Sequence, residues 1–312
     1  MKKRNMMILL LTMIMVFTAC TPETAEVTTV EETTSQIALI DGLGREVILE
    51  KPADTVISLA TSNTEILYAV GAGEQAVGRD SFSDYPTEAL ELTDIGGDFS
   101  RYDLETIVSL DPDLVLVAEI NTSELVQSIE DLGITVFYIK NPVDFTDLYV
   151  TLQDVALLTG HKEETEELID ALKARVADVE EKIAGVAEKP TVFYELDASD
   201  PAKPYTPGPG TFHTTIIEMA GGTNIGAVLD SAWAQISLEE LLVQDPEYIL
   251  LGDAMWGTTP ETVAEREGWS ALTAVNEDRV LPFDDNLLSR PGPRLVNGLE
   301  ELAKILHPNL FD

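Results

Sequence analysis

An internal repeat is the feature that most constrains how this chain can fold. The stretch LETIVSLDPDLVLV begins at Leu104, and a similar stretch, LEELLVQDPEYILL, begins at Leu238, 134 residues further on. A fixed internal offset usually indicates a repeated structural unit, and two copies are too few to build a solenoid. The repeat therefore predicts two lobes of one design.

Each copy of the repeat lies in a region where short apolar strands alternate with helix signals. In the first region, Val56 to Leu59 form a compact apolar run, and Ser62 or Asn63 can cap the helix that follows. After Pro112, the run LVLVA is continuous and apolar, as in strands buried in parallel sheets. The second region follows the same order from TVFYEL onward. We therefore expect an α/β fold of two Rossmann-like lobes with parallel sheets, over residues 37–143 and 189–312.

The segment between the lobes, residues 144–188, has a helical pattern. Gly160 interrupts it, and apolar residues then recur at helical spacing among Glu, Lys and Arg. These apolar residues are Leu168, Leu172, Val176, Val179 and Ile183. The pattern predicts a long rigid interdomain helix that joins the lobes and permits only a small hinge motion. An ordinary surface helix of one domain is the alternative.

The N-terminus has the features of a signal peptide over residues 1–19. Lys2, Lys3 and Arg4 form a positive region, and Met6 to Ala19 is an apolar run too short to span the roughly 30 Å hydrocarbon core of a membrane as a helix. Residues 20–36 are rich in Thr and Glu and contain almost no large apolar side chain. Such a segment cannot bury a core, so we expect a flexible tether.

Cys20 is the only cysteine in the chain and ends the stretch FTAC, where signal-peptide cleavage would leave it at the mature N-terminus. The stretch resembles the lipobox of bacterial lipoproteins, although Phe17 stands where Leu is usual. The resemblance implies lipidation of Cys20 and a protein held by its lipid in the cell envelope, outside the cytoplasm. A plain secretory signal is the alternative. With its one cysteine lipidated, the chain has no disulfide and no thiolate metal site.

Charge and composition argue against several functional classes. The formal net charge is −37, so the surface would repel the phosphates of nucleic acids. The three histidines, His161, His213 and His307, are scattered, which argues against a site for a bare metal ion. The sequence has no G-x-S-x-G nucleophile elbow and no phosphate-cradling Gly-rich loop with a lysine. We therefore expect a protein that is not an enzyme; a surface-anchored hydrolase and a structural or adhesive surface protein are the alternatives.

Several motifs taken together resemble one known family. They are ISLATSNTEILYAVGAGEQAVG, SFSDYP, EMAGGTNI, the two copies of the repeat and the C-terminal SRPGPRLVNGLEELAKILHP. From about Asp41 to its end, the chain resembles the class III substrate-binding proteins of ABC importers, which capture cobalamin, ferric siderophores or heme. The resemblance implies a monomer that brings its ligand to permease subunits, with no cofactor apart from cobalt or iron in the ligand. Because the local motifs are closest to the cobalamin binders, a corrinoid is the expected ligand, and a ferric siderophore or heme is the alternative.

The resemblance also gives the repeat a purpose. In this family, one glutamate on the outer face of each lobe docks against arginine pockets of the two permease subunits, and the matching residues are Glu105 and Glu239. They occupy equivalent places in the two copies, as a pseudo-twofold protein meeting a twofold transporter requires. The alternative is local: if Asp103 and Ser237 are N-caps, both glutamates lie in a first helical turn, where the helix dipole favours a carboxylate.

The ligand is expected in a cleft between the lobes, on loops at the C-terminal ends of strands. Phe82 and Tyr85 of SFSDYP, Trp233 and Arg290 are candidate contacts by similarity to the cobalamin binders, and Tyr205 is a further aromatic candidate. Flat aromatic surface with a few donors and acceptors suits a large, partly apolar macrocycle with polar arms. Packing within one lobe is the alternative for each aromatic residue.

Two positions in this expected cleft depart from the cobalamin binders, and a third could ligate a metal. Phe82 stands where a tyrosine is familiar, and Asn286 stands where the cobalamin binders carry an aspartate, so one hydrogen bond to the ligand's amides would differ. His213 lies where a Gly- and Pro-rich loop enters a helix, and a neutral imidazole there could ligate cobalt or iron. The alternative is a solvated histidine in the first helical turn.

Overall fold

The computed structural model describes residues 36–97 and 101–311. The predicted signal peptide, the lipidation site Cys20 and the predicted tether as far as residue 35 lie outside the described residues. The described residues all belong to one structural unit, Ser35–Asp312. Within them, no helix is both long enough and apolar enough to cross a membrane.

The N-terminal lobe is built on a five-stranded parallel sheet with the order β5-β4-β3-β6-β7. Its strands are β3 (Val56–Ser58), β4 (Ala76–Arg79), β5 (Thr93–Asp94), β6 (Leu114–Ala118) and β7 (Val136–Ile139). Its helices are α1 (Thr61–Ala69), α2 (Leu104–Ser109) and α3 (Ser123–Glu130), and an antiparallel hairpin of β1 (Ile37–Ile40) and β2 (Glu46–Leu49) precedes them. β6 is buried along its whole length because it pairs with β3 and β7, which explains its uninterrupted apolar sequence.

The C-terminal lobe contains a four-stranded parallel sheet with the order β10-β8-β12-β13. Its strands are β8 (Thr191–Glu195), β10 (Thr223–Asn224), β12 (Tyr248–Leu251) and β13 (Val280–Pro282), and a separate antiparallel pair is formed by β9 (Tyr205–Pro207) and β11 (Trp233–Gln235). Its helices are α6 (Phe212–Met219), α7 (Leu238–Gln244), α8 (Pro260–Ala264), α9 (Thr273–Asn276) and α10 (Leu295–Leu306). The predicted α/β fold of two lobes with parallel sheets is confirmed.

The two copies of the repeat form equivalent helix–strand units. α2 precedes β6 and α7 precedes β12, and each strand is an inner strand of its sheet. Both units turn through an aspartate with positive φ, which is 48° at Asp111 and 41° at Asp245. Aspartate enters this left-handed region more readily than most residues, and the proline that follows cannot continue the helix. The repeat thus preserves the turn as well as the helix and the strand.

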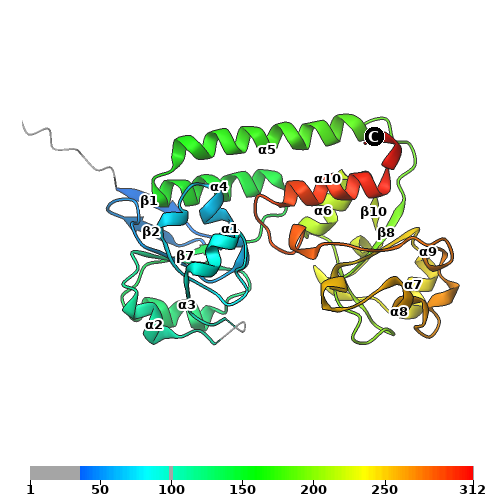
Figure 1. Cartoon of the computed structure of the whole chain (residues 1–312), viewed down its shortest axis with the longest axis horizontal. Coiled ribbons are helices and arrows are strands. Elements are labelled where there is room, and N and C mark those ends of the chain that lie inside the picture. Colours follow the sequence, from blue (N-terminus) through cyan, green and yellow to red (C-terminus); the bar gives the residue numbers. More distant parts are fainter. Residues whose placement is uncertain (1–35, 98–100, 312) are drawn as a thin grey trace, which may run out of the picture. The chain divides into compact units, whose positions relative to one another are not determined.

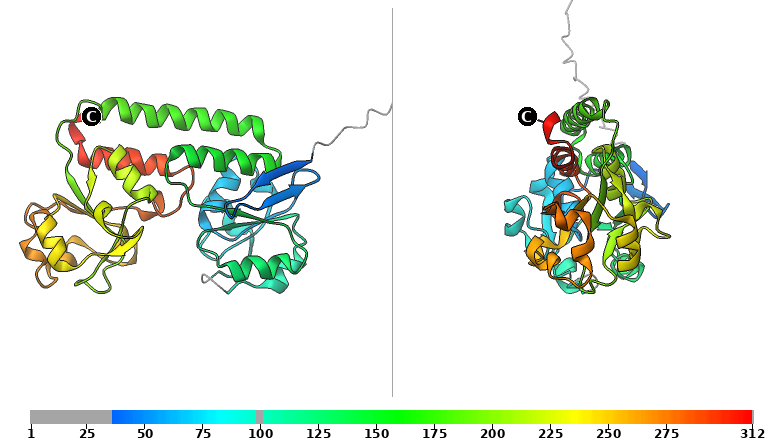
Figure 2. Two further views of the ribbon diagram at one scale, coloured as in Figure 1. Left: turned by 180° about the vertical axis from the view of Figure 1, so that it is seen from behind. Right: turned by 90° about the vertical axis from the view of Figure 1, so that its right-hand side faces the viewer.

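Two helices, α4 (Phe145–Thr159) and α5 (Lys162–Ile183), connect the lobes and meet at Gly160. α5 packs along α4 and along α10 of the C-terminal lobe (Figures 1 and 2). A core cluster that continues into both lobes buries four apolar side chains of α5, namely Ile169, Leu172, Val176 and Val179, whereas Leu168 and Ile183 are only partly buried. Arg175 of α5 also donates hydrogen bonds of 2.8 and 2.7 Å to Glu300 of α10. The predicted long helix between the lobes is therefore α5.

The start of α1 differs from the prediction. The helix begins at Thr61 after the N-cap Ala60, and no side chain caps it. Ser62 and Asn63 lie inside the helix and are buried, so neither is the cap. Only residues 59 and 60 lie between β3 and α1. The helix therefore begins before Ser62 and Asn63, the two predicted caps.

Candidate ligand-binding site

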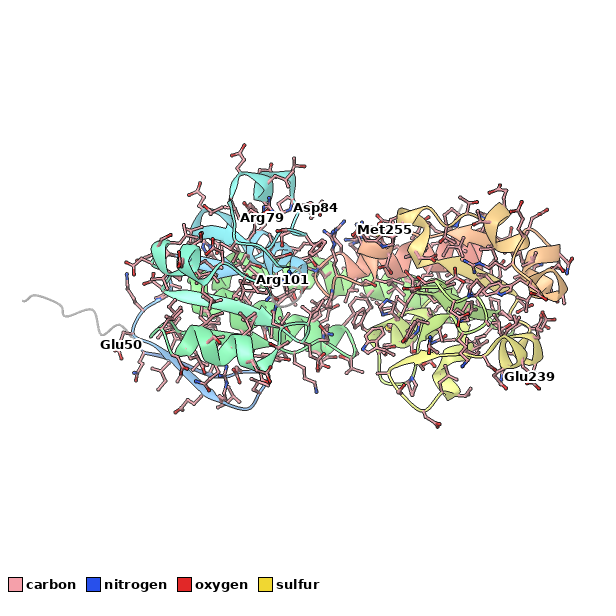
Figure 3. All side chains as sticks on the ribbon, turned by 90° about the horizontal axis from the view of Figure 1, so that it is seen from below. Glu50, Arg79, Asp84, Arg101, Glu239 and Met255 are labelled. Atoms are coloured by element: carbon pink, nitrogen blue, oxygen red, sulfur yellow. The ribbon has the colours of Figure 1, made fainter. Side chains whose placement is uncertain are left out.

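A cavity of about 710 Å³ lies between the two lobes. The N-terminal lobe lines it with segments that follow the carboxyl ends of β3, β4, β6 and β7. The C-terminal lobe contributes the start of α6, β11, the segment after β12 and residues 285–291. Figure 3 labels Asp84 and Met255, which line the cavity from different lobes. Ligands of α/β proteins bind at the carboxyl ends of strands, and the volume falls within the range of about 300–1,000 Å³ that is typical of small-molecule sites.

Exposed aromatic side chains from both lobes line this cavity. Phe82 follows β4 and is 46% exposed, and Trp233 begins β11 and is 47% exposed. Trp256, which ends the short helix η4 (Gly252–Trp256), is 77% exposed. Apolar surface gathered around one concave site marks a place where a ligand can bind.

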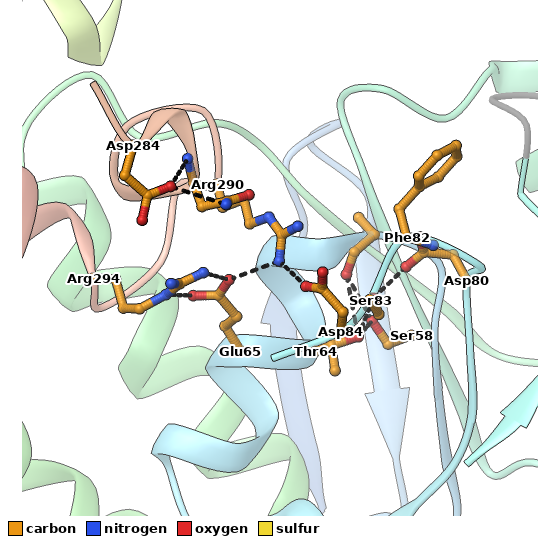
Figure 4. A network of polar contacts seen from close by, with 12 residues as sticks. Ser58, Thr64, Glu65, Asp80, Phe82, Ser83, Asp84, Asp284, Arg290 and Arg294 are labelled. Carbon is orange, nitrogen blue, oxygen red and sulfur yellow. Dashed lines mark hydrogen bonds and ion pairs between the residues drawn. The ribbon is translucent and has the colours of Figure 1, made fainter. Parts of the chain in front are cut away.

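A hydrogen-bond network holds the loop that carries Phe82 (Figure 4). Asp80 accepts a hydrogen bond of 2.9 Å from the backbone N–H of Phe82 and another from the hydroxyl of Ser83. The Ser83 hydroxyl lies 2.8 Å from that of Thr64 on α1, which donates a 2.8 Å hydrogen bond to Ser58. Burial raises the pKa of the Asp80 carboxyl, although its hydrogen bonds oppose the rise. The network therefore ties the Phe82 loop to β3 and α1.

Arginines of the C-terminal lobe bind carboxylates of the N-terminal lobe beside the cavity (Figure 4). Arg290 Nη1 lies 2.5 Å from Asp84 Oδ1 and 3.5 Å from Glu65 Oε1. Arg294 donates two hydrogen bonds, of 2.8 and 2.5 Å, to the same Glu65. Its guanidinium also lies over the ring of Tyr85, 4.0 Å from the ring centroid. Arg290 and Asp84 both line the cavity, so the predicted cleft arginine is already paired.

His213 forms part of the cavity wall but is not solvated. Its side chain is fully buried and packs against the rings of Phe212, Tyr194 and Trp233, the last with centroids 5.4 Å apart. Its Nε2 lies 3.3 Å from the hydroxyl of Ser289. Burial lowers the pKa of His213 to about 3, so the imidazole is neutral. The solvated arrangement considered for this residue is therefore wrong, because three aromatic rings cover it.

The described residues offer no cluster of ligands for a resident metal. Among the described residues, no group of three or more His, Cys, Asp or Glu side chains is arranged to hold a metal ion. The Nδ1 atom of His213 has no hydrogen-bond partner among the described residues. One imidazole can supply an axial ligand to a metal that a macrocycle already holds, but the His213 side chain, although part of the lining, is fully buried. Axial ligation by His213 stays a prediction.

Two of the predicted ligand contacts, Tyr85 and Tyr205, lie outside the cavity lining, whereas Asn286 lies in it. Tyr85 packs on Arg294, and Tyr205 lies on β9 opposite Gln235 of β11. Neither tyrosine is among the described residues that line the cavity, whereas Asn286 is. Contact of Tyr85 and Tyr205 with the ligand therefore stays a prediction.

Several residues that line the cavity were not predicted from the sequence. Met255 and Trp256 follow β12, Glu119 and Ile120 follow β6, and Asn141 follows β7. Each lies just beyond the carboxyl end of a parallel strand. The rule that ligands bind at this end of a sheet would have identified them, because the strands themselves were recognisable as apolar runs.

Glu105 and Glu239 lie at equivalent positions in the two lobes. Each is exposed in the first turn of its helix, and the caps are Asp103, which accepts from the N–H of Thr106, and Ser237. The helices α2 and α7 lie on the side of the lobes away from α5 (Figure 1), and Figure 3 labels Glu239 from that side. Both readings of these residues, as docking groups and as first-turn acids, fit these positions.

Comparison with known proteins identifies the family. A model of the family described as periplasmic binding protein matches residues 56–287. The uncharacterized ABC transporter substrate-binding lipoprotein YvrC of Bacillus subtilis is 31% identical over 280 residues, which cover 88% of this chain and 87% of that protein. The cobalamin-binding protein of Halobacterium salinarum is 28% identical over 281 residues, covering 86% of this chain and 73% of that protein. The apo structure of the periplasmic heme-binding protein RhuT from Roseiflexus sp. RS-1 is 25% identical with a TM-score of 0.73, and the match covers 83% of this chain and 99% of that one. The chain belongs to the periplasmic binding protein family.

Proposed function

We propose that this protein captures a corrinoid in the cavity between its lobes and delivers it to an ABC importer, without carrying out chemistry on it. The observation that carries the proposal is the pairing of Phe82 from one lobe with Trp233 and Trp256 from the other around a single cavity. A corrin is a broad, partly apolar ring with amide arms, so aromatic faces can cover the ring while polar lining groups bind the arms. Similarity to a cobalamin-binding protein supports this ligand.

The transport role follows from the family and from similarity to a substrate-binding lipoprotein of an ABC transporter. Ligand binding draws the lobes together slightly, because α5 packs against helices of both sides and limits the hinge. Glu105 and Glu239 then dock onto the two permease subunits, and the ligand leaves when the permease changes state. Lipid on Cys20 keeps the protein at the membrane, outside the cytoplasm.

A ferric siderophore or heme is the second candidate ligand, within the same transport role. Similarity to a heme-binding protein of this fold favours it, and exposed aromatic residues would cover a porphyrin as well as a corrin. These ligands differ from a corrinoid in charge and in their peripheral groups, so direct binding measurements can distinguish them from it.

Titration of the chain lacking residues 1–19 tests the proposal. Cyanocobalamin, a ferric hydroxamate, a ferric catecholate and heme are added separately, and binding is followed by difference absorbance and calorimetry. We expect saturable binding of cyanocobalamin. Binding of an iron chelate or heme without cyanocobalamin would keep the transport role and replace the ligand.

A further inference from the structure

Carboxyl groups dominate the charged lining of the cavity. They belong to Asp80, Asp84, Glu119 and Asp285. Among the described residues of the lining, Arg290 is the one cationic side chain. Among the described lining residues, four carboxyl groups therefore accompany a single guanidinium.

That guanidinium is already occupied by carboxylates of the protein. Arg290 lies 2.5 Å from Asp84 and 3.5 Å from Glu65. His213 adds no positive charge, because burial keeps its pKa near 3. An anionic ligand would therefore find no unpaired cation among the described lining residues, unless it displaced Asp84 from Arg290.

The remaining carboxyl groups are held by hydrogen bonds or left to solvent. Asp285 accepts hydrogen bonds of 2.7 Å from the Tyr194 hydroxyl and 2.8 Å from the Ser289 hydroxyl, and Asp80 is held by its own loop. Glu119 is exposed, and no ion-pair partner for it occurs among the described residues. Burial raises the pKa of Asp80 and of Asp285, yet a protonated carboxyl is neutral and still offers nothing that neutralises an anion.

We infer that the cleft selects a neutral or cationic ligand that carries N–H donors, and that it rejects anionic chelates. The inference rests on the proposed function and narrows its ligand class. Carboxylate oxygens accept hydrogen bonds from the amide arms of a macrocycle, whereas a carboxylate on the ligand would meet like charges in a partly desolvated site. The formal charge of −37 on the whole chain adds a long-range field of the same sign.

The sharpest test uses two ligands that differ by one charge. Cyanocobalamin is compared with its monocarboxylate, in which one propionamide arm is hydrolysed, by calorimetry with the chain lacking residues 1–19. We expect the monocarboxylate to bind about tenfold more weakly or worse at low ionic strength, and the gap to shrink as salt screens the lining. Equal or tighter binding of the monocarboxylate would show that Arg290 leaves Asp84 for the ligand, and would overturn the inference.

A pair of variants tests whether the cavity lining causes the difference in affinity between the two ligands. Glu119→Gln removes one lining charge, so it should narrow the gap between the two ligands. The matched control is Glu124→Gln, because Glu124 is exposed on α3 and is not among the described lining residues. A gap that changes equally in both variants would place the discrimination outside the cavity and count against the inference.

A second ligand pair separates this inference from the corrinoid proposal. A neutral ferric trishydroxamate and an anionic ferric triscatecholate are titrated in the same buffer. If cyanocobalamin fails and the neutral chelate binds better, the corrinoid proposal is wrong and the charge rule holds. If the triscatecholate or heme binds best, the charge rule is wrong. Binding of none of these probes would overturn both, because each requires a cleft that takes a chelate.

Discussion

Arg294 and Glu65 join the two lobes through a bidentate ion pair. The residues are 229 positions apart in sequence, and the guanidinium of one donates hydrogen bonds of 2.8 and 2.5 Å to the carboxylate of the other. The Glu65 side chain is 2% exposed, and its carboxylate is paired with Arg294 and lies 3.5 Å from Arg290. Burial alone would lower the pKa of Arg294, but the hydrogen bond to Glu65 and the charges of Glu65, Tyr85 and Asp284 together outweigh it and raise the pKa.

Replacement of Arg294 by alanine should therefore destabilise the protein strongly. We expect the free energy of unfolding, measured by urea denaturation, to fall by about 3 kcal/mol, because a buried carboxylate loses its bidentate partner and keeps only Arg290, 3.5 Å away. The double variant Arg294→Ala with Glu65→Gln should recover part of the loss, since the buried group is then uncharged. A loss below about 1 kcal/mol in the single variant would contradict this prediction, because it would mean that the ion pair contributes no more than a solvent-exposed one.

His213 should make stability fall in acid. In the folded protein its pKa is lowered from 6.5 to about 3, so the unfolded chain binds the proton more tightly. The contribution of neutral His213 to the free energy of unfolding is therefore fully present above about pH 6.5. It is lost as pH falls below that value, by about 2 kcal/mol at pH 5. His213→Phe should remove this contribution, and thermal unfolding at several pH values measures it. Parallel pH profiles for wild type and variant would contradict the assignment.

Trp233 should contribute directly to ligand binding. Removal of its ring by Trp233→Ala takes away apolar surface that the ligand would cover, so we expect cyanocobalamin to bind about 10- to 100-fold more weakly in calorimetry. The matched control is Val243→Ala, since Val243 is a 72% exposed apolar residue of α7 in the same lobe and is not among the described lining residues. Equal losses in both variants would indicate that the ligand binds outside the cavity.

Glu105 and Glu239 should matter for delivery and not for binding. Both are exposed, so replacement by alanine should change stability by no more than about 0.5 kcal/mol. We expect the double variant to take up labelled cyanocobalamin at least about tenfold more slowly in cells, with unchanged affinity in solution. Glu124→Ala is the control on another exposed helix. Normal uptake by the double variant would support the reading of both residues as ordinary first-turn acids.

The lobes could be predicted because their signals are local. The repeat, the aspartate–proline turns and apolar runs such as LVLVA report nearby structure, and parallel sheets buried on both faces require such runs. Trp256 was missed because no motif marks it, although its place after β12 was recognisable. Packing of Tyr85 on Arg294 could not be predicted, because it joins residues that are distant in the chain. The same holds for the pairing of Arg290 with Asp84, which decides the charge of the cleft.

The measurement that tests the central claim most directly is equilibrium dialysis of labelled cyanocobalamin against the chain lacking residues 1–19. The proposed function predicts saturable retention of one ligand molecule per chain, reduced by Trp233→Ala and unaffected by Val243→Ala. No retention of cyanocobalamin, with retention of heme or a ferric chelate under the same conditions, would contradict corrinoid capture.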